Sequence, residues 1–539
     1  MASKNVVAAN TEKGFASVSG DAEKRGSKKN VDMLEKEYGN IVNELRQTYS
    51  TGKTKSLAWR RKQLKAIVRM TQENSEKMVE AIRADLGGAK IRGLFDLDAN
   101  AEALMALKHL DEWAKDEPVP DPNLFGKSYI RKEPKGVVLL IAPWNFPISL
   151  TFRPLVSILA AGNCCVIKPS EVSSHSAKLI QELVEAYLPS DAVRVVQGSV
   201  AETTALLRLR YDHIMYTGNG FVARIVMKAA ANHLTPTTLE LGGKSPVFVD
   251  STAKLKLAAK RIVLSKFACN NGQICIAPDY VVVDEKRKDE FVSALKDEVV
   301  SQLGEPPYDR AFKSETDRET RAFGKIINSR HVKRIASLLE DAGGKIALGD
   351  VDSIDAERCY VPPLIVEDPN AESKLLREEI FGPVLPVVGV KNLDEAVRRV
   401  NKICDHPLAL YIFSESNRNV REILDRTTSG GVCVNSTLEQ IVNQHLPFGG
   451  VGESGMGAYH GKRGFDEFSH KRSVLERTTV LPLTALPPPS AGNFPGWLYA
   501  MALRQEIIGF LPSWLAKLLR PLGMVLVAWI VYALLRSRK

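Results

Sequence analysis

Three side chains with the chemistry for covalent catalysis stand in three short segments that are rich in glycine or proline. Cys275 follows a polar, glycine-containing bend. Thiolate is the nucleophilic form of cysteine, and a helix N-terminus or a positive charge lowers the pKa of the thiol. Glu240 ends an apolar strand beside two glycines, where desolvation raises a carboxyl pKa towards that of a general base. Asn145 lies between two prolines, a rigid mount for an amide that can donate to an oxyanion.

Each of these three assignments has an ordinary structural alternative. Cys275 could be an inert thiol packed in the core, and Glu240 could be a strand-end carboxylate paired with a lysine. Asn145 could be a turn residue that bonds its own backbone. The spacing of the residues alone leaves both interpretations open.

The cysteines predict a reducing compartment. Seven cysteines are few for 539 residues and odd in number, and no secretory segment follows Met1, so a disulfide framework is not expected. No CxxC motif or histidine pair completes a zinc set, and we predict no metal site. Cys164 and Cys165 fall in a short predicted strand that would point them to opposite faces, and we interpret them as core thiols.

The elements that must position these residues follow an α/β pattern. Apolar residues recur at spacings of three and four from residue 31 to about 115, which predicts a series of helices. Apolar runs then alternate with helical stretches, as in a parallel sheet with crossover helices. The predicted strands cover 137–142, 164–167, 193–196 and 213–216. The alternation resumes at 246–249 and continues to about residue 434, which predicts a second α/β region.

The net charge of +10 is concentrated at the two ends of the chain. Residues 491–539 carry a net +5 and residues 1–30 a net +3, which leaves +2 for the rest. A charge of +2 is too small for a basic stripe along a duplex, so we predict no nucleic-acid partner. Apolar residues make up 44% and charged residues 25%, which excludes a wholly disordered or polytopic membrane chain.

The C-terminal segment differs in composition from the rest of the chain and has features of a segment in contact with a membrane. A proline-rich linker at 481–495 precedes an amphipathic stretch with interfacial aromatics, and residues 521–535 are uncharged and followed by basic residues. Fifteen residues span about 22 Å as a helix, short of the roughly 30 Å of hydrocarbon in a bilayer. We interpret 496–539 as a membrane-anchoring tail. The alternative is a helix that docks on the body or on a partner chain. Residues 1–30 lack apolar periodicity and read as a disordered leader.

Motifs that occur in order along the chain resemble those of the aldehyde dehydrogenase superfamily. They are PWNFP at 143–147, KPSE at 168–171, YTGN at 216–219, LELGGK at 239–244, NGQIC at 271–275, EEIFGP at 378–383 and PFGG at 447–450. The resemblance covers roughly residues 35–475. Segments at 323–331, 452–461 and 468–470 are similar to the class 3 branch, in which a membrane tail is typical of fatty aldehyde dehydrogenases.

The resemblance implies a three-part α/β fold followed by the tail. Residues 31–240 would hold the N-terminal helices and a Rossmann-like NAD-binding domain, with an oligomerisation hairpin at 118–134. Residues 241–450 would form the α/β catalytic domain. Residues 451–480 would return to the NAD-binding domain and to a small β oligomerisation element, and class 3 relatives suggest a homodimer.

By the same resemblance, Cys275 attacks the aldehyde carbon, and the Asn145 amide and the Cys275 backbone N–H hold the oxyanion. Glu240 then activates the water that hydrolyses the resulting thioester to a carboxylic acid. Residues implied to bind the cofactor are Trp144, Lys168, Glu171, Gly218, Asn219, Ala223, Glu379 and Phe381. Lys168 and Glu171 would meet the adenosine ribose, where a carboxylate disfavours a 2′-phosphate, so we predict NAD, with NADP also possible. Ala223 stands where the family usually has glycine.

The expected substrates are medium- and long-chain aliphatic aldehydes, because a tethered enzyme meets them in the lipid into which they partition. One rival is an aromatic or general aldehyde dehydrogenase whose tail serves only localisation, and a remote rival is a catalytically silent scaffold. We expect attachment to a membrane through the C-terminus with the catalytic body facing the cytosol. The endoplasmic reticulum or outer mitochondrial membrane is favoured over the peroxisome or lipid droplet.

Overall fold

The computed structural model describes residues 21–120, 126–306, 308 and 323–477. Two compact units divide the chain. One comprises residues 1–113 and 134–469, and the other comprises 114–133 and 470–539. The first unit holds a six-stranded and a seven-stranded sheet, and a three-stranded sheet lies largely in the second. The predicted α/β fold with Rossmann-like sheets is confirmed.

Helices form the N-terminal part of the first unit, as the apolar periodicity predicts. They are α1 (Asp21–Ser50), α2 (Leu57–Glu73), α3 (Ser75–Leu86), α4 (Lys90–Gly93) and α5 (Ala99–Ala114). The expectation of a disordered leader over 1–30 is wrong from Asp21 onward, where α1 begins. Elongating an existing helix avoids the cost of nucleation, so the helix-forming Ala, Glu, Lys and Arg residues at 22–25 extend α1 without an apolar face. Residues 1–20 lie outside the described residues.

The six-stranded sheet has the strand order β15-β7-β6-β3-β4-β5. Its strands are β3 (Val137–Ile141), β4 (Cys164–Lys168), β5 (Val193–Val195), β6 (His213–Thr217), β7 (Thr237–Glu240) and β15 (Gly455–Met456). All neighbours are parallel except β15 and β7. Every residue of β3, β4 and β6 is buried, as expected for a sheet covered on both faces.

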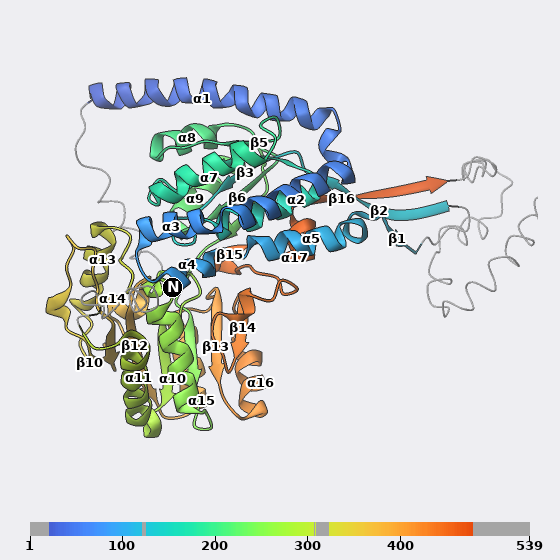
Figure 1. The fold of residues 1–539 in the computed structure, drawn as a ribbon. Helices are drawn as coiled ribbons and strands as arrows, with labels where there is room; N and C mark the ends of the chain where they lie inside the picture. The colour runs from blue at the N-terminus through green and yellow to red at the C-terminus, as the bar shows by residue number, and fades with distance from the viewer. Residues whose placement is uncertain (1–20, 121–125, 307, 309–322, 478–539) are drawn as a thin grey trace, which may run out of the picture. The chain divides into compact units, whose positions relative to one another are not determined.

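Helices link these strands and cover the sheet. They are α6 (Ser149–Ala161), α7 (Ser174–Tyr187), α8 (Val200–Arg208) and α9 (Gly220–Ala231). Figure 1 shows α1 lying along α8 in this part of the molecule. Cys164 and Cys165 are both fully buried in β4, which agrees with their interpretation as core thiols.

The seven-stranded sheet has the order β10-β11-β12-β9-β8-β13-β14. Its strands are β8 (Pro246–Val249), β9 (Tyr280–Asp284), β10 (Lys345–Leu348), β11 (Leu364–Glu367), β12 (Val384–Val390), β13 (Ala409–Phe413) and β14 (Gly431–Val434). Its helices are α10 (Leu255–Val263), α11 (Lys288–Leu303), α13 (Ser329–Leu339), α14 (Lys374–Arg377), α15 (Leu393–Ile403) and α16 (Asn417–Arg426). The helices α10 and α11 lie side by side (Figure 1). After the last loop, α17 (Gly461–Glu467) packs on α6.

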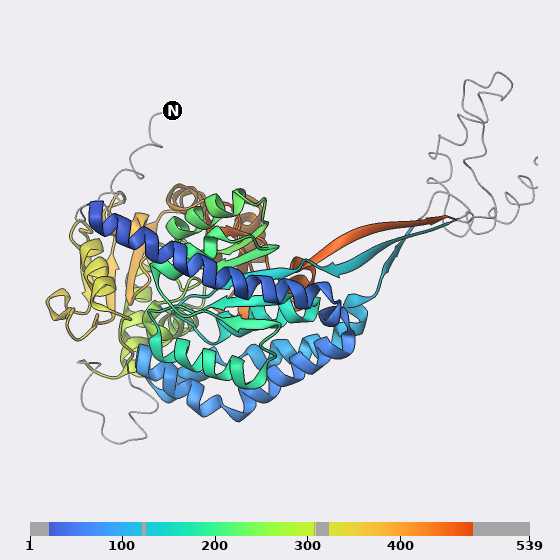
Figure 2. The same cartoon turned by 90° about the horizontal axis from the view of Figure 1, so that it is seen from above.

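The three-stranded sheet consists of β1 (Glu117–Val119), β2 (Gly126–Pro134) and β16 (Ser469–Arg477) in that order. The antiparallel pairing of β1 and β2 matches the hairpin expected at 118–134. Figure 2 shows β2 and β16 as long strands side by side. Tyr129 donates a hydrogen bond to Glu476 across them at 2.9 Å.

The proposed linker at 481–495 and tail at 496–539 lie outside the described residues. A helix with the length and apolar character needed to cross a bilayer is absent from residues 21–120, 126–306, 308 and 323–477.

Candidate active site

Four neighbouring parallel strands end at one edge of the six-stranded sheet. The register pairs Ile141 with Lys168 and with Tyr216, and it pairs Thr217 with Glu240, so β3, β4, β6 and β7 end at one level. The candidate residues at or just after these ends are Asn145, Lys168, Gly218 and Glu240. The carboxyl edge of a parallel sheet is where α/β proteins bind ligands.

The loop that carries Cys275 is bent by three consecutive left-handed residues. Asn270, Asn271 and Gly272 have φ values of 45°, 51° and 73°. Asparagine and glycine are the residues that tolerate this conformation best, so the Asn-Asn-Gly sequence sets the bend. A Cβ on Gly272 would lie 2.6 Å from the carbonyl oxygen of Gly382, so that position requires glycine. The bend follows the helical turn Leu264–Ala268, and Cys275 lies three residues after Gly272.

Asn145 is anchored to this loop. Its Nδ2 donates to the backbone carbonyl oxygen of Gln273 at 3.0 Å. The backbone carbonyl oxygen of Asn145 accepts from the Asn270 side-chain amide at 2.8 Å. A side-chain amide carries two N–H donors, so the bond to Gln273 leaves one of them for another acceptor. The structure thus brings the predicted oxyanion donor to the loop of the predicted nucleophile.

Gln273 is a residue that the sequence analysis missed. It is fully buried, and its amide joins Asn270, Lys325 and the Ile327 backbone N–H at 3.0–3.3 Å. The polar run directly before Cys275 was the available signal, but the partner segment at 325–327 lies some fifty residues further along the chain.

Glu240 is buried without a hydrogen-bond partner for either carboxylate oxygen among the described residues. Its side chain is 1% exposed. Burial raises the pKa of Glu240 well above its ordinary value, and the charge of Glu467 adds to this effect. The backbone N–H of Gly450 lies outside hydrogen-bond geometry but acts in the opposite direction. No lysine of the described segments pairs with the carboxylate, so the structure shows no support for the alternative of a paired strand-end glutamate.

The pKa of the Cys275 thiol is raised, contrary to the expectation that a positive charge or helix N-terminus lowers it. Cys275 keeps some exposed surface, yet burial of its thiol is the largest cause, followed by the charges of Glu240 and Glu379. The backbone N–H groups of Cys275 and Ile276 oppose these effects. Carboxylates from two distant segments therefore surround the thiol.

Glu379 packs against the glycines that follow Glu240. A Cβ on Gly242 would lie 2.2 Å from Oε1 of Glu379, so only glycine leaves room for this carboxylate. Its Oε1 is buried without a hydrogen-bond partner among the described residues. Burial, and then the charge of Asp279, raise the pKa of Glu379 to about 7.

The ring of Trp144 contacts two other aromatic rings, those of His331 and of Phe381, which follows Glu379 by two residues. Trp144 meets Phe381 edge-on at 5.4 Å between centroids and lies 5.2 Å from the ring of His331. Burial, and then the charges of two arginines, lower the pKa of His331 to about 4, so the ring is neutral at pH 7. His331 was not singled out as a site residue, although it closes one of the motifs that resemble the class 3 branch.

The remaining candidate residues lie at the ends of β4 and β6. Lys168 donates to Glu171 at 2.6 Å, with Lys168 buried and Glu171 exposed. Asn219 caps α9 by accepting the Val222 N–H at 2.9 Å. The 12-residue α9 begins at Gly220, and its N-terminal N–H groups favour an anion there. Ala223 is buried within α9 at 2% exposure.

Two adjacent buried residues that were not predicted from the sequence are Tyr459 and His460, and the charge of Glu240 acts on the first of them. The Tyr459 hydroxyl is buried and unpaired among the described residues, and burial followed by the charge of Glu240 raises its pKa. The adjacent His460 has a φ of 86° and stacks on Phe448 at 5.3 Å. Burial, and then Arg153, hold the pKa of His460 well below its usual range.

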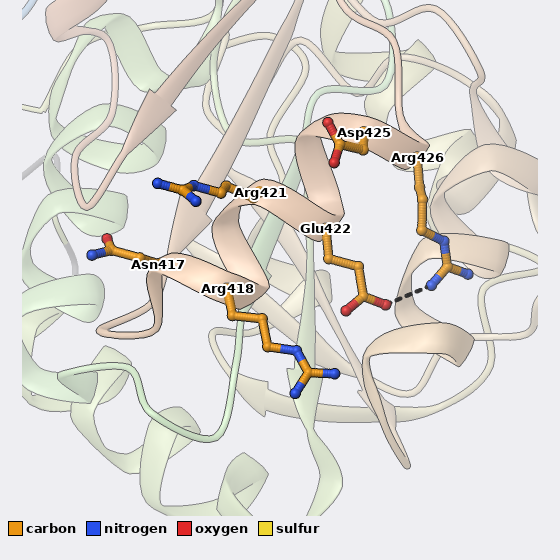
Figure 3. Close-up of a pocket in the computed structure, with 6 residues that line it drawn as sticks. All are labelled: Asn417, Arg418, Arg421, Glu422, Asp425 and Arg426. Atoms are coloured by element: carbon orange, nitrogen blue, oxygen red, sulfur yellow. Dashed lines mark hydrogen bonds and ion pairs between the residues drawn. The ribbon is translucent and has the colours of Figure 1, made fainter.

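An apolar pocket of about 210 Å³ opens beside the residue that follows Cys275. Its walls include the residues Ile276, Leu408, Val432, Leu446, Pro447 and Phe448. A larger hollow of about 510 Å³ lies on α16, where arginines and carboxylates line it and Glu422 pairs with Arg426 at 2.8 Å (Figure 3). The residues that line the α16 hollow include no nucleophile, whereas the smaller pocket is lined by the neighbour of Cys275.

Comparison with known proteins decides the family. The model of the Aldehyde dehydrogenase family matches residues 22–474. The chain belongs to the aldehyde dehydrogenase family. It is an NAD(P)-dependent aldehyde dehydrogenase.

Several relatives cover most of this aldehyde dehydrogenase. "Aldehyde dehydrogenase family 3 member A2" of Rattus norvegicus is 45% identical over 438 residues, which cover 80% of this chain and 87% of the relative. "Aldehyde dehydrogenase, dimeric NADP-preferring" of Mus musculus is 43% identical and covers 81% of this chain and 94% of the relative. A solved structure of Staphylococcus aureus AldH in a substrate-bound state is 36% identical, with a TM-score of 0.79 over 86% of this chain and 98% of that chain.

The first prediction concerns the cost of burying Glu240. Because the pKa of Glu240 is raised on folding, the folded state loses stability as pH rises from the ordinary carboxyl pKa towards the raised value, and the loss levels off above that value. We expect Glu240→Gln to raise the free energy of unfolding by about 1–3 kcal/mol at pH 9 and by less at pH 6. Urea unfolding at the two pH values measures this difference, and an equal gain at both would contradict the buried charge.

The second prediction concerns the thiol. Removing the Glu240 charge should lower the pKa of Cys275, and one pKa unit increases the thiolate fraction about tenfold. We expect Glu240→Gln to speed alkylation of Cys275 by iodoacetamide by about tenfold at pH 9. Cys275→Ala provides the blank. Asp212→Asn, at the opposite end of the sheet strands, is the control and should leave the rate unchanged. Equal rates in wild type and Glu240→Gln would contradict the geometry.

Proposed function

We propose that this enzyme oxidises medium- and long-chain aliphatic aldehydes to carboxylic acids with NAD, through a thiohemiacetal and a thioester on Cys275. The observation that carries the proposal is the convergence of three groups from separate segments. The thiol of Cys275 lies within the field of the unpaired Glu240 carboxylate, and the Asn145 amide bonds to the same loop. An apolar pocket is lined by Ile276, the residue that follows Cys275.

In the first step, the Cys275 thiol loses its proton to solvent water, the thiolate sulfur bonds to the aldehyde carbon, and the carbonyl oxygen becomes an oxyanion. The second N–H of the Asn145 amide and the Cys275 backbone N–H are the donors for that oxyanion. The hydrogen bond to Gln273 already fixes the Asn145 amide. The amide therefore stabilises the oxyanion without changing its own position.

Glu240 acts in the hydrolytic step. Its carboxylate has no partner among the described residues that would hold it ionised, so it takes a proton readily. A water molecule loses a proton to Glu240 and attacks the thioester carbon, and the carbon–sulfur bond breaks to release the acid and the thiolate. A general base of this kind favours water as the acceptor rather than coenzyme A.

The residues present fit a nicotinamide dinucleotide. Glu379 has a buried, unpaired oxygen for a ribose hydroxyl, and Phe381 offers a ring beside the nicotinamide. Lys168 and Glu171 suit the adenosine ribose, and the start of α9 suits the pyrophosphate. When bound, the cofactor supplies the acceptor for the hydride that leaves the aldehyde carbon.

Glu171 supports a preference for NAD. Its carboxylate would repel a 2′-phosphate on the adenosine ribose, although Lys168 offsets part of its charge at 2.6 Å. Three relatives are named as preferring NADP, so NADP remains the second candidate.

The apolar pocket supports an aliphatic substrate, because each buried CH₂ adds about 0.8 kcal/mol of transfer free energy. A tail at 496–539 that attaches the enzyme to a membrane would bring it to such aldehydes. We propose C-terminal attachment with the catalytic body facing the cytosol, at the endoplasmic reticulum or outer mitochondrial membrane. The name of the mouse relative supports a homodimer.

The third prediction is that NADH forms from hexadecanal and NAD with wild type but not with Cys275→Ala. Along a series of aliphatic aldehydes, kcat/KM should rise with chain length, by up to about fourfold per CH₂ where the group is fully buried. Steady-state absorbance at 340 nm measures both. A chain-length series that is flat, or a strong preference for short or aromatic aldehydes, would overturn the aliphatic assignment.

A tail deletion separates this assignment from its rival. If the pocket selects long chains, protein lacking residues 491–539 keeps the preference in detergent solution. If the tail serves only localisation and the pocket is unselective, the deleted protein shows no chain-length dependence.

The fourth prediction concerns Glu171→Gln. Loss of the carboxylate leaves Lys168 free to meet a 2′-phosphate, so we expect kcat/KM for NADP relative to NAD to rise about tenfold. Glu182→Gln, an exposed carboxylate on α7, is the matched control and should leave the ratio unchanged. A ratio that does not respond to Glu171→Gln would remove Glu171 from the adenosine site.

A further inference from the structure

The turn at residues 379–381 carries both groups proposed for the nicotinamide half of the cofactor. Glu379 places its carboxylate over Gly242, and Phe381 meets Trp144. Phe381 has a φ of 50°, a conformation that a bulky residue adopts only where its surroundings impose it. The Oε1 of Glu379 has no hydrogen-bond partner among the described residues. The backbone of the turn must therefore fix where this oxygen lies.

Arg334 on α13 holds the carbonyl side of the turn. Its two guanidinium nitrogens donate to the carbonyl oxygens of Glu379 at 3.0 Å and of Ile380 at 2.5 Å. A planar guanidinium fixes two acceptors in one plane, which a single ammonium cannot do. Two successive peptide units are thereby oriented.

Asp279 holds the opposite side of the same peptide segment. Its carboxylate oxygens accept the backbone N–H of Ile380 at 3.2 and 3.4 Å, and the side chain is only 3% exposed. The N–H of Asp279 in turn donates to the carbonyl oxygen of Ser245 at 2.8 Å. The backbone of Ile380 is thus hydrogen-bonded at both its polar groups: its N–H to Asp279 and its carbonyl oxygen to Arg334.

Two buried lysines keep Asp279 in place. Lys244 Nζ lies 2.6 Å from one carboxylate oxygen and Lys266 Nζ lies 3.4 Å from the other, with side-chain exposures of 3% and 0%. Lys244 follows the glycines on which Glu379 rests, and Lys266 lies in the π-helical turn Leu264–Ala268 before the Cys275 loop. Asp279 therefore ties three segments together: the residues after β7, the approach to Cys275 and the 379–381 turn.

We propose that Asp279 and Arg334 are positioning residues that hold Glu379 and Phe381 where the nicotinamide ribose and ring bind. The inference rests on the proposed roles of Glu379 and Phe381. It goes further by assigning cofactor affinity to a backbone clamp whose members need not touch the cofactor. A purely structural role for the clamp would affect stability alone, whereas a positioning role affects NAD binding while cofactor-free chemistry at Cys275 continues.

The test is Asp279→Asn in the full-length enzyme, a change that keeps an acceptor for Ile380 but removes the charge and one carboxylate oxygen. We expect the dissociation constant for NAD, measured by quenching of tryptophan fluorescence, to rise about tenfold. Hydrolysis of p-nitrophenyl acetate without NAD should stay within about twofold of wild type, because an activated ester acylates Cys275 without a hydride acceptor. Unchanged NAD affinity, or equal losses in both assays, would overturn the proposal.

Asp212→Asn is the matched control. Asp212 also accepts a backbone N–H, from Val137 at 2.8 Å, and pairs with a basic side chain, Arg46, at 2.9 Å, but it lies at the amino end of β3. Its replacement should leave NAD affinity unchanged. If Asp279→Asn does not fold, Arg334→Met carries the same expectation, since it removes both carbonyl contacts while Asp279 stays paired with its two lysines.

A double-mutant cycle with Glu379→Gln tests whether the clamp acts through Glu379. In that background, Asp279→Asn should have a much smaller effect on NAD affinity than it has alone. Full additivity would contradict action through this residue. Failure of wild type to bind NAD would instead refute the proposed function, so the two failures are distinguishable.

Discussion

The burial of an unpaired carboxylate beside a thiol is the constraint on which the rest of the site depends. An unpaired carboxylate is more stable in water than in a protein interior. The strand that carries Glu240 is held on both sides, so its backbone cannot move to expose the side chain. Its carbonyl oxygen accepts from Gly218 at 3.0 Å, and its strand pairs with β6 on one side and β15 on the other. The sheet therefore imposes a buried position on the carboxylate, and its pKa is raised as a result.

The carboxylates around the site divide by whether they have partners. Asp279 is paired with two lysines and accepts a backbone N–H, which suits a charge that must persist as a structural support. Glu240 has no partner for either oxygen, and one oxygen of Glu379 has none, so burial raises the pKa of both residues. Whether a buried carboxylate is paired or has a raised pKa thus depends on its immediate neighbours.

Much of this arrangement could be predicted from the sequence, because strands and motifs are local. The run at 246–249 is β8, and the ordered motifs led to Cys275, Glu240 and Asn145. The raised thiol pKa could not be predicted in this way, since Glu379 comes from 104 residues beyond Cys275. Asp279 and Arg334 look ordinary in the sequence, and only folding brings both to the backbone of Ile380. The N-terminal extension of α1 was missed because helix propagation needs no apolar pattern.

The two sheets meet through opposite ends of their strands, so a short connection is enough to bring residues of both sheets to one site. Asn145, Lys168 and Glu240 lie at the carboxyl edge of the six-stranded sheet, whereas Asp279 and Glu379 precede β9 and β12 at the amino edge of the seven-stranded sheet. Five residues, 241–245, connect β7 to β8, and an extended chain covers at most about 3.6 Å per residue. The connection therefore holds the edges within about 20 Å, and its Gly242 leaves the space that the Glu379 carboxylate occupies. A longer or bulkier connection would separate the base from the groups proposed to hold the hydride acceptor.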